Sequence, residues 1–374
     1  SPPVSAEAAP TAILSRGGTL PTPAKEYPCR LTVTNSFGTA SADFTLTVSA
    51  WWHVEEIPYV PFRTNSSIRS PRFSLDGILC GASSYKDDNG DRIVAYERLE
   101  EGSWTVEQAA LGRPDYSGMG FGFDSRGNPA ISWGDYNDGA IHFAAKHGGE
   151  WRHEVVAPCG PPNGLIAPST ELSFTAQDRA VIAYSYFSTV GVARETAGGW
   201  EILDPPRGPV ALLPDGRVAV ANNEDNQNRA MLFKETDSGW DSTLIVEASE
   251  GDVAYTNCIV IDSAGLARLV VGGMQLGLNV AREQPNGSFI LDPISRPVEG
   301  ITWNMRLALP SDNEELVFFT ALWGEETPEL AWREAVGWRY LDCPIEGATE
   351  TLSLLFPPIG YPVVVSQTQM AAYW

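Results

Sequence analysis

A bulky aromatic residue recurs through most of this chain at intervals of roughly 40–50 residues. Each time it stands just after a small turn. The seven aromatic residues are Trp52, Trp104, Trp151, Trp200, Trp240, Phe289 and Trp338. A short apolar phrase that ends in charged residues precedes most of them, as in Gly-Val-Ala-Arg-Glu at 191–195. Self-similarity of this kind predicts a repeat architecture in which every repeat forms one small structural unit.

Each repeat contains four apolar segments in the same order. In the clearest repeat we predict strands at 118–123, 130–133, 140–146 and 151–156. The turn between the first two strands carries Asp124 and Gly127, and Asp-Gly or Asp-x-x-Gly turns recur at the same place in other repeats. Asp bonds local backbone in such turns and Gly adopts a positive φ, so we interpret these aspartates as turn residues.

The last repeat is short of one strand. It supplies strands at 351–356, 361–365 and 369–373, and then the chain ends. The missing fourth strand is present near the start, at Trp52–Ile57, whose pattern matches the fourth strands that begin at Trp104 and Trp151. Pairing of the two ends would close a ring and remove its open edges. We therefore predict an all-β fold, a seven-bladed β-propeller over residues 51–374 with an N-terminal strand clasp.

Residues 1–50 do not follow the repeat pattern. Apolar and polar residues alternate over 27–35 and 43–48 around an Asn-Ser-Phe-Gly turn, which predicts a β-hairpin. This sequence resembles the last strands of a PKD-type, immunoglobulin-like domain of bacterial surface proteins. A complete sandwich needs about 90–100 residues. The chain is then a fragment of a longer protein, or another chain supplies the missing strands, or residues 1–26 complete a reduced sandwich.

The charge balance excludes some partners. Lys and Arg total 25 against 47 Asp and Glu, which gives a net charge of −22. Binding to nucleic acid needs an excess of basic residues, so we expect no nucleic-acid partner. We also expect no membrane insertion, because no apolar run approaches the ~18 residues of a span. Cys80 and Cys258 lie in apolar strand-like runs and are predicted to be core residues rather than ligands.

The phrase Asp-x-x-Gly-x-Pro-x-Ile-Ser-Trp at 124–133, followed by Trp151, resembles the repeats of secreted bacterial propellers of the sialidase-like (BNR-type) group. The resemblance implies an extracellular or cell-surface location. For a sialidase it would imply three arginines that face the channel, a Tyr nucleophile assisted by a Glu, and an acidic residue. One set of basic residues occupies one equivalent position in six repeats and is predicted to serve the blades: Arg98, Lys146, Arg194, Lys234, Arg282 and Arg333.

Residues that break the repeat are the candidates for a binding site. Arg72 and Arg306 lie in or beside predicted channel-lining strands where other repeats carry small or apolar residues. Four further residues stand at the entrances to such strands: Tyr116, Tyr255, Trp303 and Asn304. Aromatic faces beside polar groups suit sugar rings, so this set predicts a glycan site. Packing at strand ends is the alternative interpretation.

Acidic loops between the second and third strands supply oxygen atoms that a calcium ion could use. The candidate ligands are Asp87, Asn89, Asp91, Asp135 and Asn137. Hard cations take six to eight oxygens, but neither loop has the full twelve-residue calcium pattern. The alternative is a solvated acidic hairpin tip. We expect no other cofactor.

No catalytic set is visible in the sequence. The histidines His53, His142, His147 and His153 form no H-E-x-x-H pair, and His142 on a third strand is poorly placed for catalysis. We therefore expect no catalytic residues, and an extracellular, non-catalytic binding or structural propeller. Residues 1–48 could join it to a protein partner or to itself in a surface assembly. The alternative is a glycan-active enzyme, a sialidase-like hydrolase or a polysaccharide lyase, that uses the channel face.

Overall fold

The structure of the 374-residue chain is a computed structural model. It describes residues 25–35, 38–48, 52–56, 69–114, 118–161, 168–186, 189–223, 228–249, 254–273, 276–294, 305–311, 314–319, 329–334, 337–342, 353–355, 363–365 and 369–373. Side-chain surroundings are described within these ranges from residue 71 onward. Every regular element in these ranges is a β-strand. None of the described residues forms a helix long and apolar enough to cross a membrane.

Seven four-stranded antiparallel sheets account for most of the described strands. Sheet 1 contains β4 (Arg69–Phe73), β5 (Leu79–Lys86), β6 (Arg92–Glu100) and β7 (Ser103–Leu111). Sheet 2 contains β8 (Gly120–Phe123), β9 (Pro129–Gly134), β10 (Ala140–His147) and β11 (Glu150–Pro158). Sheet 3 contains β12 (Ser169–Phe174), β13 (Ala180–Tyr186), β14 (Thr189–Thr196) and β15 (Gly199–Leu203).

The remaining sheets follow the same order. Sheet 4 contains β16 (Val210–Leu212), β17 (Val218–Asn223), β18 (Arg229–Thr236) and β19 (Gly239–Glu247). Sheet 5 contains β20 (Tyr255–Ile261), β21 (Ala267–Gly273), β22 (Gly277–Glu283) and β23 (Phe289–Pro293). Sheet 6 contains β24 (Met305–Ser311), β25 (Glu314–Phe319), β26 (Glu329–Glu334) and β27 (Gly337–Asp342). Sheet 7 contains β28 (Ser353–Leu355), β29 (Val363–Val365), β30 (Gln369–Tyr373) and β3 (Trp52–Glu56).

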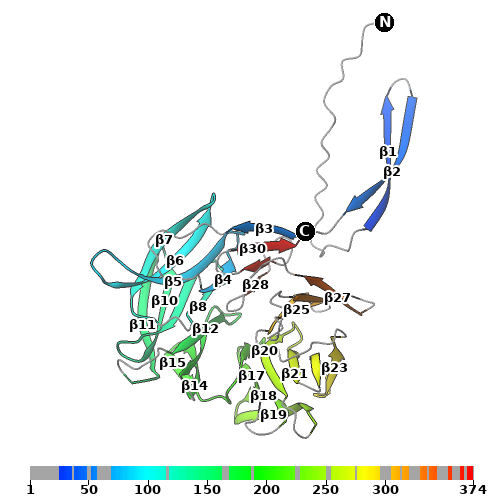
Figure 1. The fold of residues 1–374 in the computed structure, drawn as a ribbon. Helices are drawn as coiled ribbons and strands as arrows, with labels where there is room; N and C mark the ends of the chain where they lie inside the picture. The colour runs from blue at the N-terminus through cyan, green and yellow to red at the C-terminus, as the bar shows by residue number, and fades with distance from the viewer. Residues whose placement is uncertain are drawn as a thin grey trace.

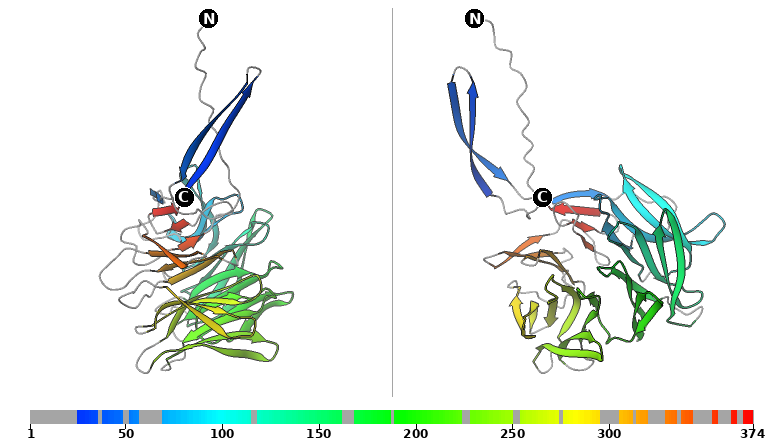
Figure 2. Two further views of the ribbon diagram at one scale, coloured as in Figure 1. Left: turned by 90° about the vertical axis from the view of Figure 1, so that its right-hand side faces the viewer. Right: turned by 180° about the vertical axis from the view of Figure 1, so that it is seen from behind.

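The sheets follow one another around a common centre (Figures 1 and 2). Their first strands lie innermost: β8 lies against both β4 and β12, β20 against β24, and β28 against both β24 and β4. The recurring aromatic residue stands at or next to the start of the fourth strand in all seven sheets. The fold is therefore a β-propeller, as the repeat predicted.

The predicted clasp between the two ends of the propeller is confirmed. In sheet 7, β3 pairs antiparallel with β30, and Trp52 lies opposite Tyr373 while Glu56 lies opposite Gln369. The five residues of β3, which follow the N-terminal hairpin, thus pair with the last strand of the chain. This pairing covers an edge that β30 would otherwise expose.

The predicted hairpin in the first fifty residues is also present. β1 (Lys25–Asn35) pairs with β2 (Gly38–Val48) in a two-stranded sheet, with Asn35 opposite Gly38. The hairpin extends away from the propeller (Figure 1). Residues 1–24 lie outside the described residues, so the immunoglobulin-like sandwich and the domain boundary at residue 50 stay predictions.

The turns between first and second strands show the predicted chemistry. Asp124 Oδ1 accepts the N–H groups of Arg126 and Asn128 at 2.9 and 2.8 Å, and Gly127 has φ = 82°. Sheet 3 departs from this pattern, because Asp178 stands where the turns of sheets 1, 2, 4 and 5 carry glycine and has φ = 58°. Its carboxylate accepts the N–H and O–H of Ser125 in sheet 2, at 2.7 and 2.8 Å. This contact between sheets compensates for a backbone conformation that a non-glycine residue rarely adopts.

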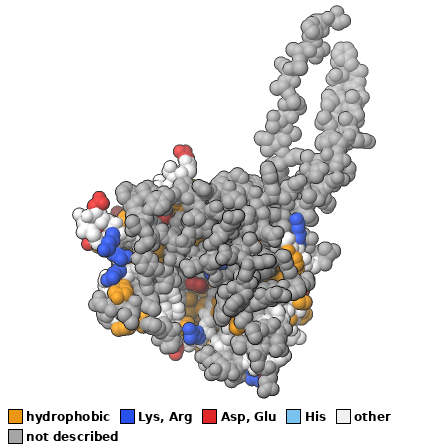
Figure 3. All heavy atoms as spheres, in the orientation of Figure 1, with side chains coloured by type: hydrophobic (Ala, Val, Ile, Leu, Met, Phe, Trp, Pro, Cys, Tyr) orange, Lys and Arg blue, Asp and Glu red, His pale blue; other side chains and the backbone are white. Residues whose placement is uncertain are grey.

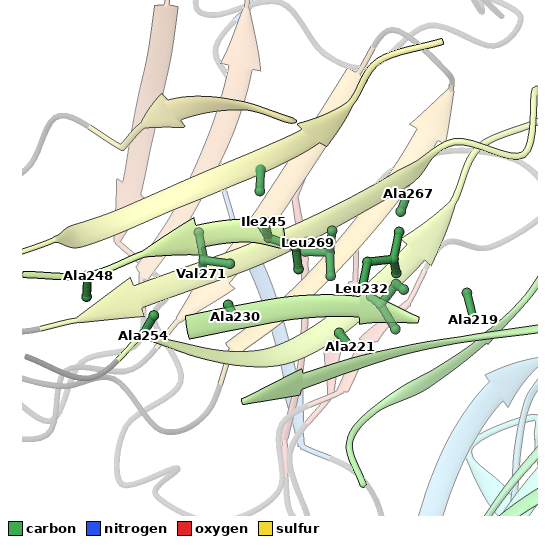
Figure 4. Packing of buried hydrophobic residues seen from close by; sticks show 12 residues of the cluster. Ala219, Ala221, Ala230, Leu232, Ile245, Ala248, Ala254, Ala267, Leu269 and Val271 are labelled. Carbon is green, nitrogen blue, oxygen red and sulfur yellow. The ribbon is translucent and has the colours of Figure 1, made fainter. Parts of the chain in front are cut away.

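The cores lie between neighbouring sheets. Figure 4 shows the cluster between sheets 4 and 5, in which Leu232, Leu269 and Val271 pack among alanines, and all three are almost fully buried. Cys80 and Cys258 are buried in equivalent clusters, which confirms their predicted core role. Small residues on one face let the larger side chains of the next sheet interdigitate at high packing density.

Ion pairs join the sheets near their outer strands. Arg194 of β14 contacts Glu235 of β18 at 2.8 Å, and Lys234 of β18 contacts Glu283 of β22 at 2.7 Å. Both glutamates also accept a backbone N–H of their own sheet, at 3.0 Å from Val218 and 2.8 Å from Ala267. Each pair therefore fastens one sheet to the next one along the chain.

The strand register corrects our prediction that the six basic residues are equivalent. Arg98, Arg194, Lys234 and Arg282 lie opposite the residue after the repeated aromatic. Lys146 and Arg333 lie opposite the aromatic residue itself. A shift of one residue moves a side chain to the other face of a sheet. Accordingly Lys146 reaches back to Glu107 of sheet 1 at 2.6 Å, and Arg333 reaches back to Asp292 of sheet 5 at 2.6 Å.

Gly120 of β8 allows β8 and β12 to approach closely. A Cβ atom there would collide with Ser132 Oγ and would lie 2.6 Å from the backbone nitrogen of Leu172. We expect Gly120→Ala to lower the free energy of unfolding by about 1–3 kcal/mol, because the backbone of the next sheet cannot yield. Urea denaturation measures this loss. Gly198→Ala is the control, since its Cβ would meet only Thr196 Oγ1 at 4.0 Å, and an equal loss in both variants contradicts the argument.

Glu283 lies at the centre of one cross-sheet joint, with its side chain only 8% exposed. Glu283→Ala removes the carboxylate that the Lys234 ammonium and the Ala267 N–H both contact, and leaves the ammonium with the Gly265 carbonyl at 3.2 Å, so we expect a loss of about 3 kcal/mol in the free energy of unfolding. Glu247→Ala breaks an exposed pair with Arg229 and should cost under about 0.5 kcal/mol. The shift of the urea midpoint reports both values. Similar losses for the two variants would show that the joint contributes no more than a surface pair.

Candidate functional site

The inner strands carry the two predicted arginines. Arg72 is the fourth residue of β4 in sheet 1, and Arg306 is the second residue of β24 in sheet 6. Both side chains are solvent-exposed, and each donates from Nη1 to the carbonyl of the preceding residue at 3.0 Å. Within the described residues neither guanidinium has an ion-pair partner at contact distance. They can therefore donate to a ligand.

Electrostatic interactions place Arg72, Arg306 and Glu171 of β12 in one region. Loss of hydration lowers the pKa of the Arg72 guanidinium, the charge of Glu171 raises it, and the charge of Arg306 lowers it further. Arg72 reaches water yet is surrounded by protein, which is the situation of a side chain on an inner wall. Since charges in water are screened within about 10 Å, the two groups whose charges act on Arg72 lie in its neighbourhood. Sequence reasoning missed Glu171, although it breaks an apolar pattern in a first strand.

The other predicted site residues are placed only in part. Tyr255 begins β20 and is half-buried. Tyr116, Trp303 and Asn304 lie outside the described residues. The predicted aromatic component of the site therefore stays a prediction apart from Tyr255. On the face shown in Figure 3, described basic and acidic side chains are interspersed and form no single charged patch.

The first predicted calcium loop is an ordinary turn held by its own carboxylate. Asp87 Oδ1 accepts the N–H groups of Asn89 and Asp91 at 3.0 and 2.8 Å. All these side chains but that of Asp87 are exposed. The bonds are those that Asp makes in turns without any metal. They occupy an oxygen that a cation would use.

The second predicted calcium loop is more buried. Asp135 is 5% exposed, and its two oxygens accept the N–H groups of Arg113 at 2.7 Å and Asn137 at 2.8 Å. In this way Asp135 fastens the β7–β8 connection to the β9–β10 loop. Across the described ranges, no group of three or more His, Cys, Asp or Glu side chains is arranged around a possible metal position. The calcium assignment stays a prediction.

A histidine pair that sequence reasoning did not recognise lies in sheet 2. His142 of β10 contacts Asp138 through Nε2 at 3.0 Å, and its Nδ1 lies 2.8 Å from Nε2 of His153 on β11. Because Asp138 accepts from Nε2, Nδ1 is the acceptor and His153 Nε2–H donates. The two imidazoles and the indole of buried Trp133 have nearly parallel planes with centroids 5.1–5.3 Å apart. The array fixes the tautomer of His153, an exposed residue, with Nε2 as the donor and Nδ1 unprotonated.

The sequence contained a signal for this pair. The repeated aromatic Trp151 sets the hairpin register, with Lys146 opposite Trp151 and Ala144 opposite His153. His142 is then a diagonal neighbour of His153 on the same face, at a distance that long side chains bridge. Treating each histidine separately concealed this relation. The face they share is that of Ala144 and Trp133, which packs against sheet 1.

The sequence matches no protein-family model and no curated protein. Solved structures match it as propellers. The β-propeller domain of the trilobed protease from Pyrococcus furiosus matches 83% of this chain and 95% of that domain, with a TM-score of 0.52 and 10% identity. A puromycin-hydrolysing peptidase of Mycobacterium tuberculosis matches 82% of this chain and 52% of its own, with a TM-score of 0.51 and 13% identity.

These likenesses establish the class of fold and nothing finer. The chain spans about half the length of the puromycin-hydrolysing peptidase. A Hadza microbial sialidase matches 75% of this chain and 69% of its own at 12% identity, but its TM-score of 0.41 supports no inference. The protein is a β-propeller, and propellers of this kind occur in peptidases. The fold is therefore compatible with catalysis and with binding alone.

Protonation of His153 should destabilise the folded chain. Burial and the neighbouring His142 lower the pKa of His153, against the opposing charges of Asp135 and Asp138. Because the folded-state pKa is below the unfolded value of about 6.5, the stabilisation is complete above that pH and is lost as pH falls through the folded pKa. We expect wild type to lose more thermal stability than His153→Gln between about pH 7.5 and 5. His147→Gln, at the exposed end of β10, is the control, and parallel pH profiles for wild type and His153→Gln would refute the expectation.

Proposed function

We propose that this protein is a non-catalytic binding propeller that holds an anionic ligand, such as an acidic sugar, at the inner wall of its ring. The observation that supports this proposal best is the pair Arg72 and Arg306. They extend from inner strands of two sheets into the same exposed neighbourhood, without carboxylate partners in contact among the described residues. Two guanidiniums without carboxylate contacts among the described residues, one of them subject to the charge of the other, favour a bound anion.

The chemistry of the pair selects carboxylate or sulfate groups. A guanidinium offers a planar fork of N–H donors that matches both oxygens of a carboxylate. The chain as a whole carries a net charge of −22, which repels anions. A basic pair therefore marks a place on the protein where an anion can bind. Glu171 nearby would accept hydroxyl groups of the same ligand. A sugar acid combines these features, and the half-buried ring of Tyr255 would suit its apolar face if Tyr255 reaches the same region.

We also propose an extracellular or cell-surface location and a role for residues 1–48 in assembly. The support is the hairpin of β1 and β2, which leaves the propeller as a separate two-stranded sheet. Two strands alone are marginally stable in water, so further strands from this protein or a partner would stabilise them. A strand-pairing surface of that kind suits a subunit of a surface assembly.

A glycan-active enzyme is the second candidate. The observation that favours it is the convergence of Arg72, Arg306 and the carboxylate of Glu171. Two arginines and an acid are part of the set that the sialidase resemblance implies. A hydrolase or lyase would need a nucleophile or base beside them.

Substitution of Arg72 tests the binding proposal. We expect N-acetylneuraminic acid or oligogalacturonate, measured by isothermal titration calorimetry, to bind the wild type at least about tenfold more tightly than Arg72→Gln or Arg306→Gln. Loss of one charge-assisted hydrogen bond corresponds to such a factor. Arg229→Gln removes a basic side chain from an exposed pair on β18 and should leave the affinity unchanged.

Two results would decide against the proposal. Equal affinity in wild type and both arginine variants would remove the inner wall as the binding site. Release of product from a sialoside or a polyuronate, abolished by Glu171→Gln, would identify the enzyme instead. A folded far-ultraviolet circular dichroism spectrum for every variant ensures that the comparison concerns binding.

A further inference from the structure

A cavity of about 620 Å³ lies between sheets 2 and 3, away from the inner wall. Phe143 and Ala145 of β10 and Phe174 of β12 contribute apolar surface to it, and Glu195 of β14 lies on the side of sheet 3. The contact of Ser125 with Asp178 joins the two turns that border it. Its volume is that of a small-molecule site.

A single break in the repeat creates this cavity. Ala145 lies opposite Arg152, the residue after the repeated Trp151. Arg194, Lys234 and Arg282 occupy the same register in sheets 3, 4 and 5, and each extends to a glutamate of the next sheet. Sheet 2 carries alanine at this position. Its basic residue, Lys146, stands one residue later and faces sheet 1 instead of sheet 3. The space that a long basic side chain fills at the next junctions is therefore empty here.

The acceptor for the missing basic side chain is still in place. Glu195 lies opposite Trp200, as Glu235 lies opposite Trp240. Like its equivalents, Glu195 accepts a backbone N–H of its own sheet, from Ala180 at 3.1 Å. Among the described residues, its other oxygen has only Arg179 of the same sheet nearby, at 3.6 Å, which is longer than a hydrogen bond. Glu195 thus keeps the geometry of the joint without a cation from sheet 2.

We propose that this cavity binds an organic cation, an amine or guanidinium on an alkyl chain, with the charged nitrogen at Glu195 where Arg or Lys stands in the following junctions. The ligand is a small amine or the side chain of a lysine or arginine in a peptide. The rings of Phe143 and Phe174 offer apolar surface and π faces to the alkyl stem and the cation. This site is distinct from the arginine pair on the inner wall and does not depend on the function proposed for it.

The charges around the cavity support a cation over an anion. Arg126 is engaged by Asp124 at 3.4 Å and by Asp178 at 3.8 Å, so its charge is already compensated. The lining holds four carboxylates against three guanidiniums, in a chain of net charge −22: Asp124, Asp178, Glu154 and Glu195 against Arg126, Arg152 and Arg179. A positively charged ligand is attracted by this field.

Filling the cavity from the protein side provides the sharpest test. Ala145→Arg restores the basic residue that the repeat has at this register. We expect it to raise the unfolding temperature, since it forms the cross-sheet pair with Glu195, and to weaken binding of butylguanidine at least about tenfold in calorimetry. Glu195→Gln should weaken binding by a similar factor while its amide oxygen still accepts the Ala180 N–H. Ser242→Arg adds the same charge at an exposed site on β19 and should change neither quantity.

The probes separate the outcomes. Butylurea has the shape of butylguanidine without its charge, and binding of both with equal affinity would overturn the proposal. So would unchanged butylguanidine affinity in Glu195→Gln, which stays informative even if Ala145→Arg fails to fold. Tighter binding of a lysine-containing peptide than of butylguanidine or butylamine would support the proposal and assign a peptide as the source, and the reverse order would support a free amine.

Discussion

Which face of the third strand carries the basic residue decides whether that residue contacts the next sheet or the preceding one. In sheets 3 to 5 a basic residue opposite the position after the aromatic reaches the next sheet, as Lys234 reaches Glu283. One position later, the side chain reaches the preceding sheet, as Lys146 reaches Glu107. Strand alternation alone produces both directions. The closed arrangement of the sheets rests on these joints together with the apolar clusters between them.

The sequence was sufficient for the fold because the signals were local and repeated. An aromatic at the start of each fourth strand and an Asp or Gly in each first turn mark the same elements in every repeat. Where the pattern of one repeat is ambiguous, the other repeats show which strand is meant. The clasp followed from a missing strand in the last repeat and a spare one at Trp52, which β3 and β30 confirm. The hairpin at 25–48 needed only alternation and a turn.

The candidate site was harder to predict from the sequence, because it depends on strand register and on residues that come together from different sheets. Ala145 and Lys146 are adjacent, and a comparison of sequence patterns cannot tell which of them faces the next sheet. His142 and His153 are eleven residues apart and meet only because the hairpin register makes them diagonal neighbours. Arg72 and Arg306 could be recognised as departures from the repeat. The presence of Glu171 beside them follows from three inner strands that lie far apart in sequence.

Several departures from the repeat lie in sheet 2 and at its junction with sheet 3, and the mechanics of a repeat fold explain how it tolerates them. Stability in such folds is a sum over units and the interfaces between neighbours, so one weakened junction leaves the others intact. The junction of sheets 2 and 3 lacks the cross-sheet cation, yet Ser125 and Asp178 hold its turns together and Gly120 lets β12 approach at the inner end. Contacts at the inner strands and turns thus allow the space between them to remain open. A cavity supported in this way keeps its shape without a ligand, which lowers the entropic cost of binding.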